Sequence, residues 1–162
     1  MAGSATGTGN IFEFNGHYYE VVLADSAEHY SAFIDAESRQ YNGIQGHLVT
    51  ITSADENQFV TDYLNSVSAP VGEYYTAGSD SATEGTFIWV QGPEAGTNVE
   101  DDYTNWWSEG YGSGNEPNSY VPNYDYDVAD SITISIYWDS SNTSSTDGGT
   151  WFDWASGNSV IK

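Results

Sequence analysis

The chain has 162 residues, with 24 Asp and Glu against 2 Lys and Arg, and its formal net charge is −22. This length suits a single domain with one hydrophobic core. The charge repels nucleic acid phosphates and anionic membrane surfaces, so we expect no nucleic acid partner. The absence of cysteine excludes a disulfide framework, a thiol nucleophile and a thiolate-bound zinc. No apolar run is long enough to cross a bilayer, so membrane insertion is not expected.

The N-terminal segment is expected to be a linker. "MAGSATGTG" lacks the basic and apolar regions of a signal peptide. We therefore assign residues 1–15 to a linker and residues 16–162 to the domain. The domain begins with "HYYEVVLA" at 17–24, whose aromatic and β-branched residues predict a strand.

A helix is predicted immediately after this strand. Asp25 or Ser26 can cap it, and Gly43 ends the pattern, which gives about four turns. The apolar residues at helical spacing are Tyr30, Phe33, Ile34 and Tyr41.

A second helix follows "GHLVTIT". In "SADE", Ser53 and Glu56 form a capping box, in which each side chain can satisfy the backbone amide of the other residue. The stripe expected to be buried consists of Phe59, Val60, Tyr63, Leu64 and Val67.

From Glu73 onward the helical period is lost. "YYTAGS", "TFIWVQG" and "SITISIYW" read as strands, separated by segments rich in Gly, Asn, Ser and Asp. Two long loops result, Gly92–Val128 and Asp139–Gly149, and long loops in compact domains are often functional. The order of strand, helix, helix and then several strands predicts an α+β fold.

Four segments in this order resemble the C-type lectin-like domain. They are "GHLVTITSADENQFV", "GSDSATEGTFIWVQG", "YTNWWSEGYGSGNEPN" and "GTWFDW". The resemblance covers most of the chain. It implies the C-type lectin-like fold, in which two helices flank small antiparallel sheets and a long loop region binds calcium.

The resemblance also implies a Ca²⁺ site. In the family the Glu-Pro peptide is cis, and a cis bond before Pro117 would aim the side-chain oxygens of Glu116 and Asn118 at one cation. "WFD" stands where the family has Trp-Asn-Asp, so Asp153 is retained and one amide ligand is missing. The family adds an acidic ligand after the signature, for which the spacing favours Asp125 or Asp127, with Asp130 as a further candidate.

The acid-then-amide order resembles the mannose, glucose and fucose class of the family. Two neighbouring sugar hydroxyls would bind the cation, donate to Glu116 and accept from Asn118. Asp153 is expected at the same sugar site, and Tyr120 and Tyr111, which flank the signature, are candidate contacts. Trp89, Trp138, Trp151 and Trp154 lie on strand-like segments and are expected in the core instead.

The lack of cysteine and the acidity resemble lectin modules of large bacterial adhesins. This implies an extracellular module of a longer surface chain, which binds glycans on cell surfaces and acts in cell adhesion. After "WFD", either Ser159–Lys162 is a shortened closing strand or the sequence stops within a longer polypeptide.

Other functions have less support. The three histidines, His17, His29 and His47, show no metal-binding spacing, and no nucleophile elbow or phosphate loop is present, so we expect no enzyme. The alternative is a protein-binding or peptide-binding module that uses the same calcium-braced loop. An ice-binding surface ranks below it, because no regular Thr array is evident.

Overall fold

The computed structural model describes residues 6–7, 9–27, 29–107, 117, 131–136, 149–153 and 157–162. Its elements, in chain order, are β1 (Thr6–Gly7), β2 (Phe12–Phe14), β3 (His17–Ala27), α1 (His29–Ser38), β4 (Gln40–Tyr41), β5 (Ile44–Gln45), α2 (Ala54–Ser66), β6 (Gly72–Ser79), β7 (Ile88–Trp89), a 3-10 turn (Val99–Asp101), β8 (Ser131–Ile136), β9 (Trp151–Asp153) and β10 (Gly157–Ile161).

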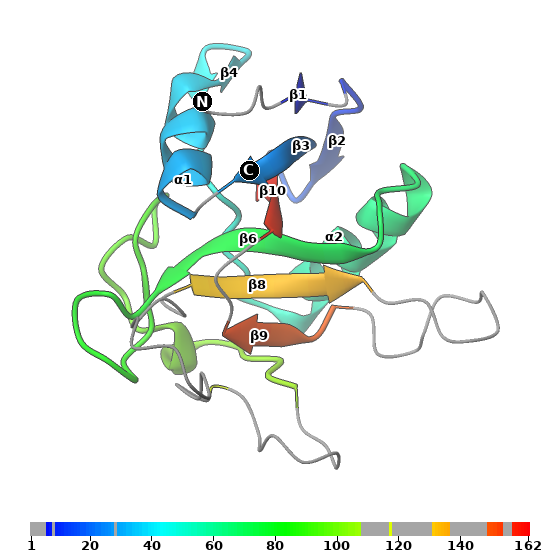
Figure 1. Ribbon diagram of the computed structural model, residues 1–162. Coiled ribbons are helices and arrows are strands. Elements are labelled where there is room, and N and C mark those ends of the chain that lie inside the picture. The colour runs from blue at the N-terminus through cyan, green and yellow to red at the C-terminus, as the bar shows by residue number, and fades with distance from the viewer. Residues whose placement is uncertain are drawn as a thin grey trace, which may run out of the picture.

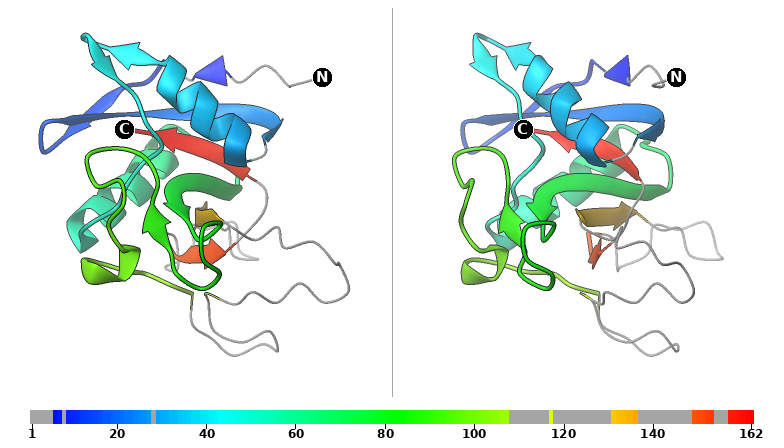
Figure 2. Two further views of the ribbon diagram at one scale, coloured as in Figure 1. Left: turned by 90° about the vertical axis from the view of Figure 1, so that its left-hand side faces the viewer. Right: turned by 60° about the vertical axis from the view of Figure 1, so that its left-hand side comes forward.

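Within these residues, eight strands form one sheet. Its order is β1-β3-β10-β6-β8-β9, with β2 paired to β3 and β7 paired to β6 (Figure 1). β10 lies in the middle, antiparallel to β3 and parallel to β6. α1 contacts β10 and β6, whereas α2 contacts β2 and β8. Both views of Figure 2 show α1 lying alongside β10. The predicted α+β fold, with helices flanking mainly antiparallel strands, is confirmed.

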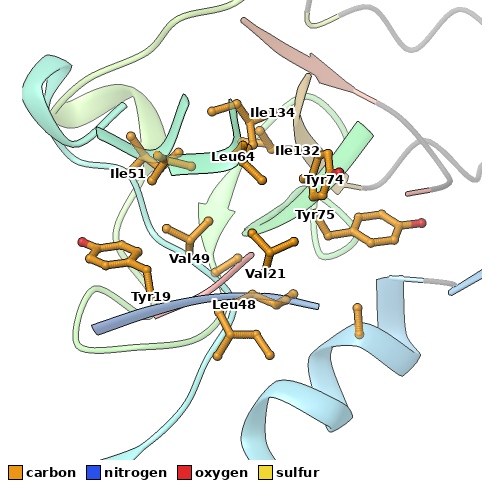
Figure 3. Packing of buried hydrophobic residues seen from close by; sticks show 14 of the residues in the cluster. Tyr19, Val21, Leu48, Val49, Ile51, Leu64, Tyr74, Tyr75, Ile132 and Ile134 are labelled. Atoms are coloured by element: carbon orange, nitrogen blue, oxygen red, sulfur yellow. The ribbon is translucent and has the colours of Figure 1, made fainter. Parts of the chain in front are cut away.

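The core is built from the sheet, α2 and the buried face of α1. It includes the segment before α2, where Leu48, Val49 and Ile51 are fully buried although they form no regular strand (Figure 3). Backbone bonds hold this segment, since Val49 O accepts from Ala77 N at 2.8 Å, and His47 and Lys162 exchange both of their backbone hydrogen bonds. Each buried aliphatic side chain contributes about 1.5–3 kcal/mol to folding.

The predicted first helix is wrong at both ends. β3 continues through Asp25 and Ser26, the two proposed caps, because Ala27 still pairs with Gly157 of β10. α1 therefore begins at His29, and it ends at Ser38.

The predicted apolar face of α1 is wrong for Tyr30, Ile34 and Tyr41, whereas Phe33 is partly buried against the core. Tyr30 is 73% exposed and Ile34 is 48% exposed, whereas the small residues Ala32 and Ala36 are buried. Small side chains let α1 approach β10 and β6 closely, and this is why the larger apolar residues did not mark the buried face.

A hairpin occupies the end of the segment predicted as helix. Gln40 pairs with Gln45 and Tyr41 with Ile44 across a turn at Asn42 and Gly43. Both turn residues have positive φ, 51° and 80°. Asn-Gly is the preferred sequence for such a two-residue turn, so the local turn chemistry overrides the apolar spacing.

The second helix is confirmed, as is half of its capping box. Ser53 Oγ accepts from Glu56 N at 3.2 Å, and Val60, Tyr63 and Leu64 are buried as predicted. The carboxylate of Glu56 turns away from the Ser53 amide and accepts from Thr52 N at 3.1 Å.

Both ends of the described chain join the sheet. β2 lies within the residues assigned to a linker, yet it pairs with β3, and Phe14 stacks on Phe59 of α2 with ring centroids 4.6 Å apart. The sequence alone does not decide whether a closing strand follows "WFD". The structure contains one, β10, and it starts at Gly157, two residues earlier than expected. In the described ranges, no helix is long and apolar enough to cross a bilayer.

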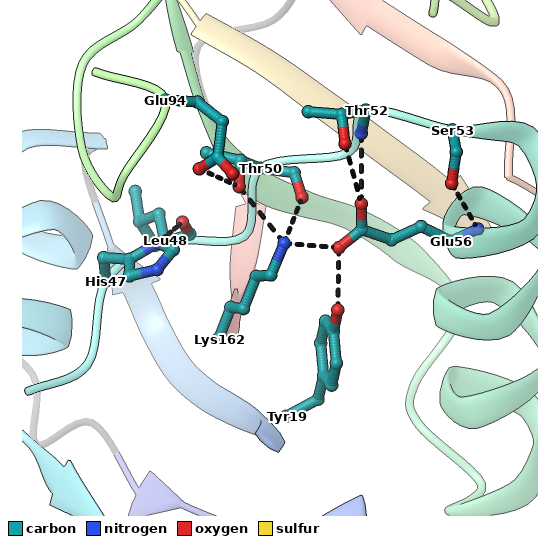
Figure 4. A network of polar contacts seen from close by, with 9 residues as sticks. All are labelled: Tyr19, His47, Leu48, Thr50, Thr52, Ser53, Glu56, Glu94 and Lys162. Atoms are coloured by element: carbon teal, nitrogen blue, oxygen red, sulfur yellow. Dashed lines mark hydrogen bonds and ion pairs between the residues drawn. The ribbon is translucent and has the colours of Figure 1, made fainter. Parts of the chain in front are cut away.

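A buried ion pair joins Lys162, the residue after β10, to α2, and β3 contributes a hydrogen bond to it. Lys162 Nζ lies 2.6 Å from Glu56 Oε1, with side chains only 4% and 6% exposed, and Tyr19 donates to the same oxygen at 2.7 Å (Figure 4). Desolvation raises the pKa of Glu56, but hydrogen bonds from Lys162, Tyr19 and the Thr52 amide outweigh it and hold the pKa below its usual range. Burial, followed by the hydrogen bond to Glu56, raises the pKa of Tyr19 far above normal.

Removing one member of this pair should destabilise the domain strongly. Glu56→Gln leaves Lys162 buried without its counter-charge, so we expect a loss of about 3–5 kcal/mol at neutral pH by urea unfolding. Asp62→Asn, which weakens only the exposed hydrogen bond from Gln58, should cost less than about 0.5 kcal/mol.

The difference between wild type and Glu56→Gln should also depend on pH. Because the pKa of Glu56 is lower in the folded state, its carboxylate stabilises the domain at pH values above the ordinary pKa of 4.5. This stabilisation is lost as the pH falls through the folded pKa. The two unfolding free energies should therefore converge in acid. A difference that stays constant down to acidic pH would contradict the assigned role of the Glu56 carboxylate.

Candidate functional site

Asp153, a predicted calcium ligand, lies at the end of β9. Side chains alternate along a strand, so Trp151 and Asp153 share the inner face, with exposures of 0% and 5%. Phe152 points to the other face, where its ring stacks on Trp107 with centroids 5.8 Å apart. The residue that replaces the family's asparagine is therefore engaged in aromatic packing.

Both flanks of the loop that carries Glu116 and Asn118 are held beside β9. On the first flank, Trp107 N donates to Trp151 O at 3.0 Å, and Trp151 N donates to Asn105 O at 2.8 Å. On the second flank, Ile132 of β8 pairs directly with Asp153. The segment 108–130 thus leaves and rejoins the described chain next to Asp153.

The carbonyl oxygen of Gly149, just before β9 in the chain, accepts two side-chain hydrogen bonds. It accepts from Asn105 Nδ2 at 2.8 Å and from Asn57 Nδ2 of α2 at 3.0 Å. The other end of the Asn57 amide accepts from Trp151 Nε1 at 2.8 Å. One buried amide therefore connects α2, the approach to β9 and the central indole.

Trp151 is also the centre of an aromatic cluster. The rings of Trp89, Tyr103 and Trp106 meet it edge-on, with centroids 6.1, 5.7 and 5.8 Å away. Edge-to-face contacts of this kind add to the stabilisation from burial. The prediction that Trp89 and Trp151 belong to the core is confirmed, while Trp138 and Trp154 lie outside the described residues.

The donor chemistry of Asp153 fits Ca²⁺. A buried carboxylate is stable only when it is hydrogen-bonded, paired or bound to a cation, and its hard oxygens suit calcium. Pro117 is described and exposed. The other predicted site residues lie outside the described part: Tyr111, Glu116, Asn118, Tyr120, Asp125, Asp127 and Asp130. Among the described residues themselves, no group of three or more His, Asp or Glu could hold a metal.

Sequence reasoning missed the residues that support this site. Asn57, Asn105 and Gly149 were not singled out. A signal was present in α2, where Asn57 shares the helical spacing of the buried residues Val60 and Leu64. For Gly149 the sequence offers only a turn-like "DGG", which does not reveal a partner 92 residues away.

Comparison with known proteins agrees with this arrangement. The human scavenger receptor C-type lectin carbohydrate-recognition domain matches with a TM-score of 0.66 at 15% identity, covering 94% of this chain and 95% of that one. C-type lectin CEL-I from Cucumaria echinata matches with a TM-score of 0.65 at 20% identity, covering 94% of each chain. An α+β domain of this topology therefore has the C-type lectin fold.

The family assignment rests on the sequence. The profile of the Lectin C-type domain matches residues 37–146, so this chain belongs to the C-type lectin domain family. Halomucin from Haloquadratum walsbyi is 36% identical over 116 residues, which cover 67% of this chain. The chain spans 1% of the length of that relative.

Gly149→Ala should disrupt the support of β9. A Cβ at this position would collide with Thr61 Oγ1 and meet Asn57 Nδ2, and φ is +88°. The matched control is Gly96→Ala, which has the same φ of +88° but nothing within 4 Å. We expect Gly96→Ala to cost about 1–2 kcal/mol for the backbone alone. Gly149→Ala should cost clearly more in urea unfolding, and equal costs would contradict the packing argument.

Proposed function

We propose that this domain is a Ca²⁺-dependent carbohydrate-binding module for mannose-, glucose- or fucose-type sugars. The observation that carries the proposal is that both flanks of the Glu116-Pro117-Asn118 loop are fastened next to the buried carboxylate of Asp153. The family supports binding rather than catalysis. A fold match at 19% identity and a TM-score of 0.60, the cow CD23 carbohydrate-recognition domain, was solved in the presence of GlcNAc2Man3 oligosaccharide.

The residues that would hold Ca²⁺ are Glu116, Asn118, Asp153 and either Asp125 or Asp127. The bound cation would supply a positive centre for two neighbouring sugar hydroxyls. The Glu116 carboxylate would accept a hydrogen bond from one hydroxyl, and the Asn118 amide would donate one to the other. Tyr120 would contact the sugar ring beside them.

Such a site binds weakly, because the sugar exchanges water contacts for protein contacts of similar strength. Firm adhesion then needs several sites acting together. The match to a small part of halomucin supports a role as one module of a longer chain. We propose that this longer chain is an extracellular adhesin that binds glycans on cell surfaces.

Asp153→Asn should weaken calcium binding. It removes one negative charge from the ligand set and keeps the shape of the side chain, so we expect the Kd for Ca²⁺ to rise about tenfold or more by isothermal titration calorimetry. Asp102→Asn, a change at an exposed acid beside the 3-10 turn, should leave the Kd unchanged. Equal effects of the two variants would assign the loss to net charge instead of ligation.

A glycan array tests the sugar assignment. The domain should bind mannose- or fucose-type glycans at about millimolar Ca²⁺, and chelator should abolish this signal. Glu116→Gln with Asn118→Asp should lose these ligands, because that order is typical of galactose-type members. If the folded domain gives no calcium-dependent sugar signal, the loop serves a protein or peptide ligand.

A further inference from the structure

A second concave site lies toward the opposite end of the sheet from Asp153. A cavity of about 410 Å³ is bounded by β3, the β4–β5 hairpin and the end of β10. In the strand order, β10, β6 and β8 separate β3 from β9, and Figure 1 shows β4 and β9 at opposite ends of the molecule. The cavity is therefore separate from the proposed calcium site.

The charges around this cavity are already compensated. Arg39 and Lys162, the 2 basic residues of the chain, both line it. Arg39 bonds Glu20 at 3.1 Å and Asp35 at 2.8 Å, while Lys162 is paired with Glu56. An anionic ligand would meet no uncompensated cation and would also be repelled by the net charge of −22. A cationic ligand would meet no free carboxylate among the lining residues, because Glu20 is already paired with Arg39, so we infer that the cavity favours a neutral ligand.

The walls combine aromatic and aliphatic surface with a few polar groups. Tyr18 and Tyr41 meet edge-on with centroids 4.9 Å apart, and Ile44 is 60% exposed. Gln45 donates its amide to Glu37 O at 3.0 Å, which leaves its side-chain oxygen available as an acceptor, and Gln40 adds an exposed amide. Apolar walls with a few oriented polar groups are typical of small-ligand sites.

A pyranose ring matches these properties. It is uncharged, it presents a face of C–H groups that packs on tyrosine, and its hydroxyls can bond the amides at the rim. Glu20 is the one acidic residue among those lining the cavity, and Arg39 already engages it. The lining residues therefore offer no free carboxylate to bind calcium, and the sugar contacts described above require no cation.

We propose that this cavity is a second, calcium-independent carbohydrate site, which takes one or two neutral pyranose rings. A domain with two sites far apart can contact one long glycan twice or two glycans at once, which raises the effective concentration for the second contact. This site does not use the calcium loop, so the two proposals stand or fall separately.

Saturation-transfer NMR on the whole 162-residue chain in excess EDTA tests the proposal. The probes are cellobiose and N,N′-diacetylchitobiose, with glucuronic acid as the anionic comparison. We expect both neutral disaccharides to bind and glucuronic acid to bind at least about tenfold more weakly. Absence of binding by both disaccharides, or equal binding of glucuronic acid, overturns the proposal.

Matched variants locate the binding. Tyr41→Ala and Ile44→Ser should each weaken the disaccharides by about tenfold, equivalent to about 1.4 kcal/mol of lost contact. Tyr30→Ala, at a 73% exposed tyrosine on α1 that does not line the cavity, should have no effect. Glu116→Gln should also leave binding in EDTA unchanged. Equal effects of Tyr30→Ala and Tyr41→Ala in folded protein would overturn the assignment to the cavity.

Discussion

The insertion of β10 between β3 and β6 holds the two halves of the sheet together. β3 brings β1 and β2 with it, and β6 brings β7, β8 and β9. β10 bonds both halves, antiparallel on one side and parallel on the other. Lys162, which directly follows β10, also enters the ion pair with Glu56. The final strand is therefore fixed by backbone pairing along its length and by a buried charge at its end.

The chain has no cysteine, so its long loops cannot be fixed by disulfides. Around β9, side-chain amides and aromatic rings hold the described flanks of these loops. Asn57 and Asn105 share the carbonyl of Gly149, and three rings surround Trp151. A buried polar network of this kind specifies one arrangement when its members are satisfied. The position of Asp153 thus follows from contacts that span the sequence from α2 to β9.

The comparison of sequence with structure separates local signals from long-range ones. α2 was predicted well because its cap at Ser53 and its apolar stripe are both local. α1 was not, because its buried face consists of Ala32 and Ala36, which carry little pattern, and because pairing with β10 extends β3 over the expected cap. The Asn42-Gly43 turn carried a readable hairpin signal that the apolar spacing obscured.

The candidate site shows the same division. Family-like motifs predicted the C-type lectin fold, which is confirmed. The same motifs nominated Asp153 and the signature loop as the site, and this assignment stays a prediction. The supporting contacts of Asn57, Asn105 and Gly149 join residues 44 to 94 positions apart, so no local window of sequence contains them. Likewise, the cavity beside Tyr41 is formed by the two ends of the chain and a hairpin, and it exists only in the folded arrangement.

The two basic residues have a further consequence because both are committed to internal ion pairs. No lysine or arginine remains to balance the carboxylates on the rest of the surface, so the folded domain is a polyanion held compact against its own repulsion. Dissolved ions screen that repulsion over about 10 Å at 0.1 M salt and about 3 Å at 1 M. Because dissolved salt screens this repulsion, we expect added salt to favour the native state.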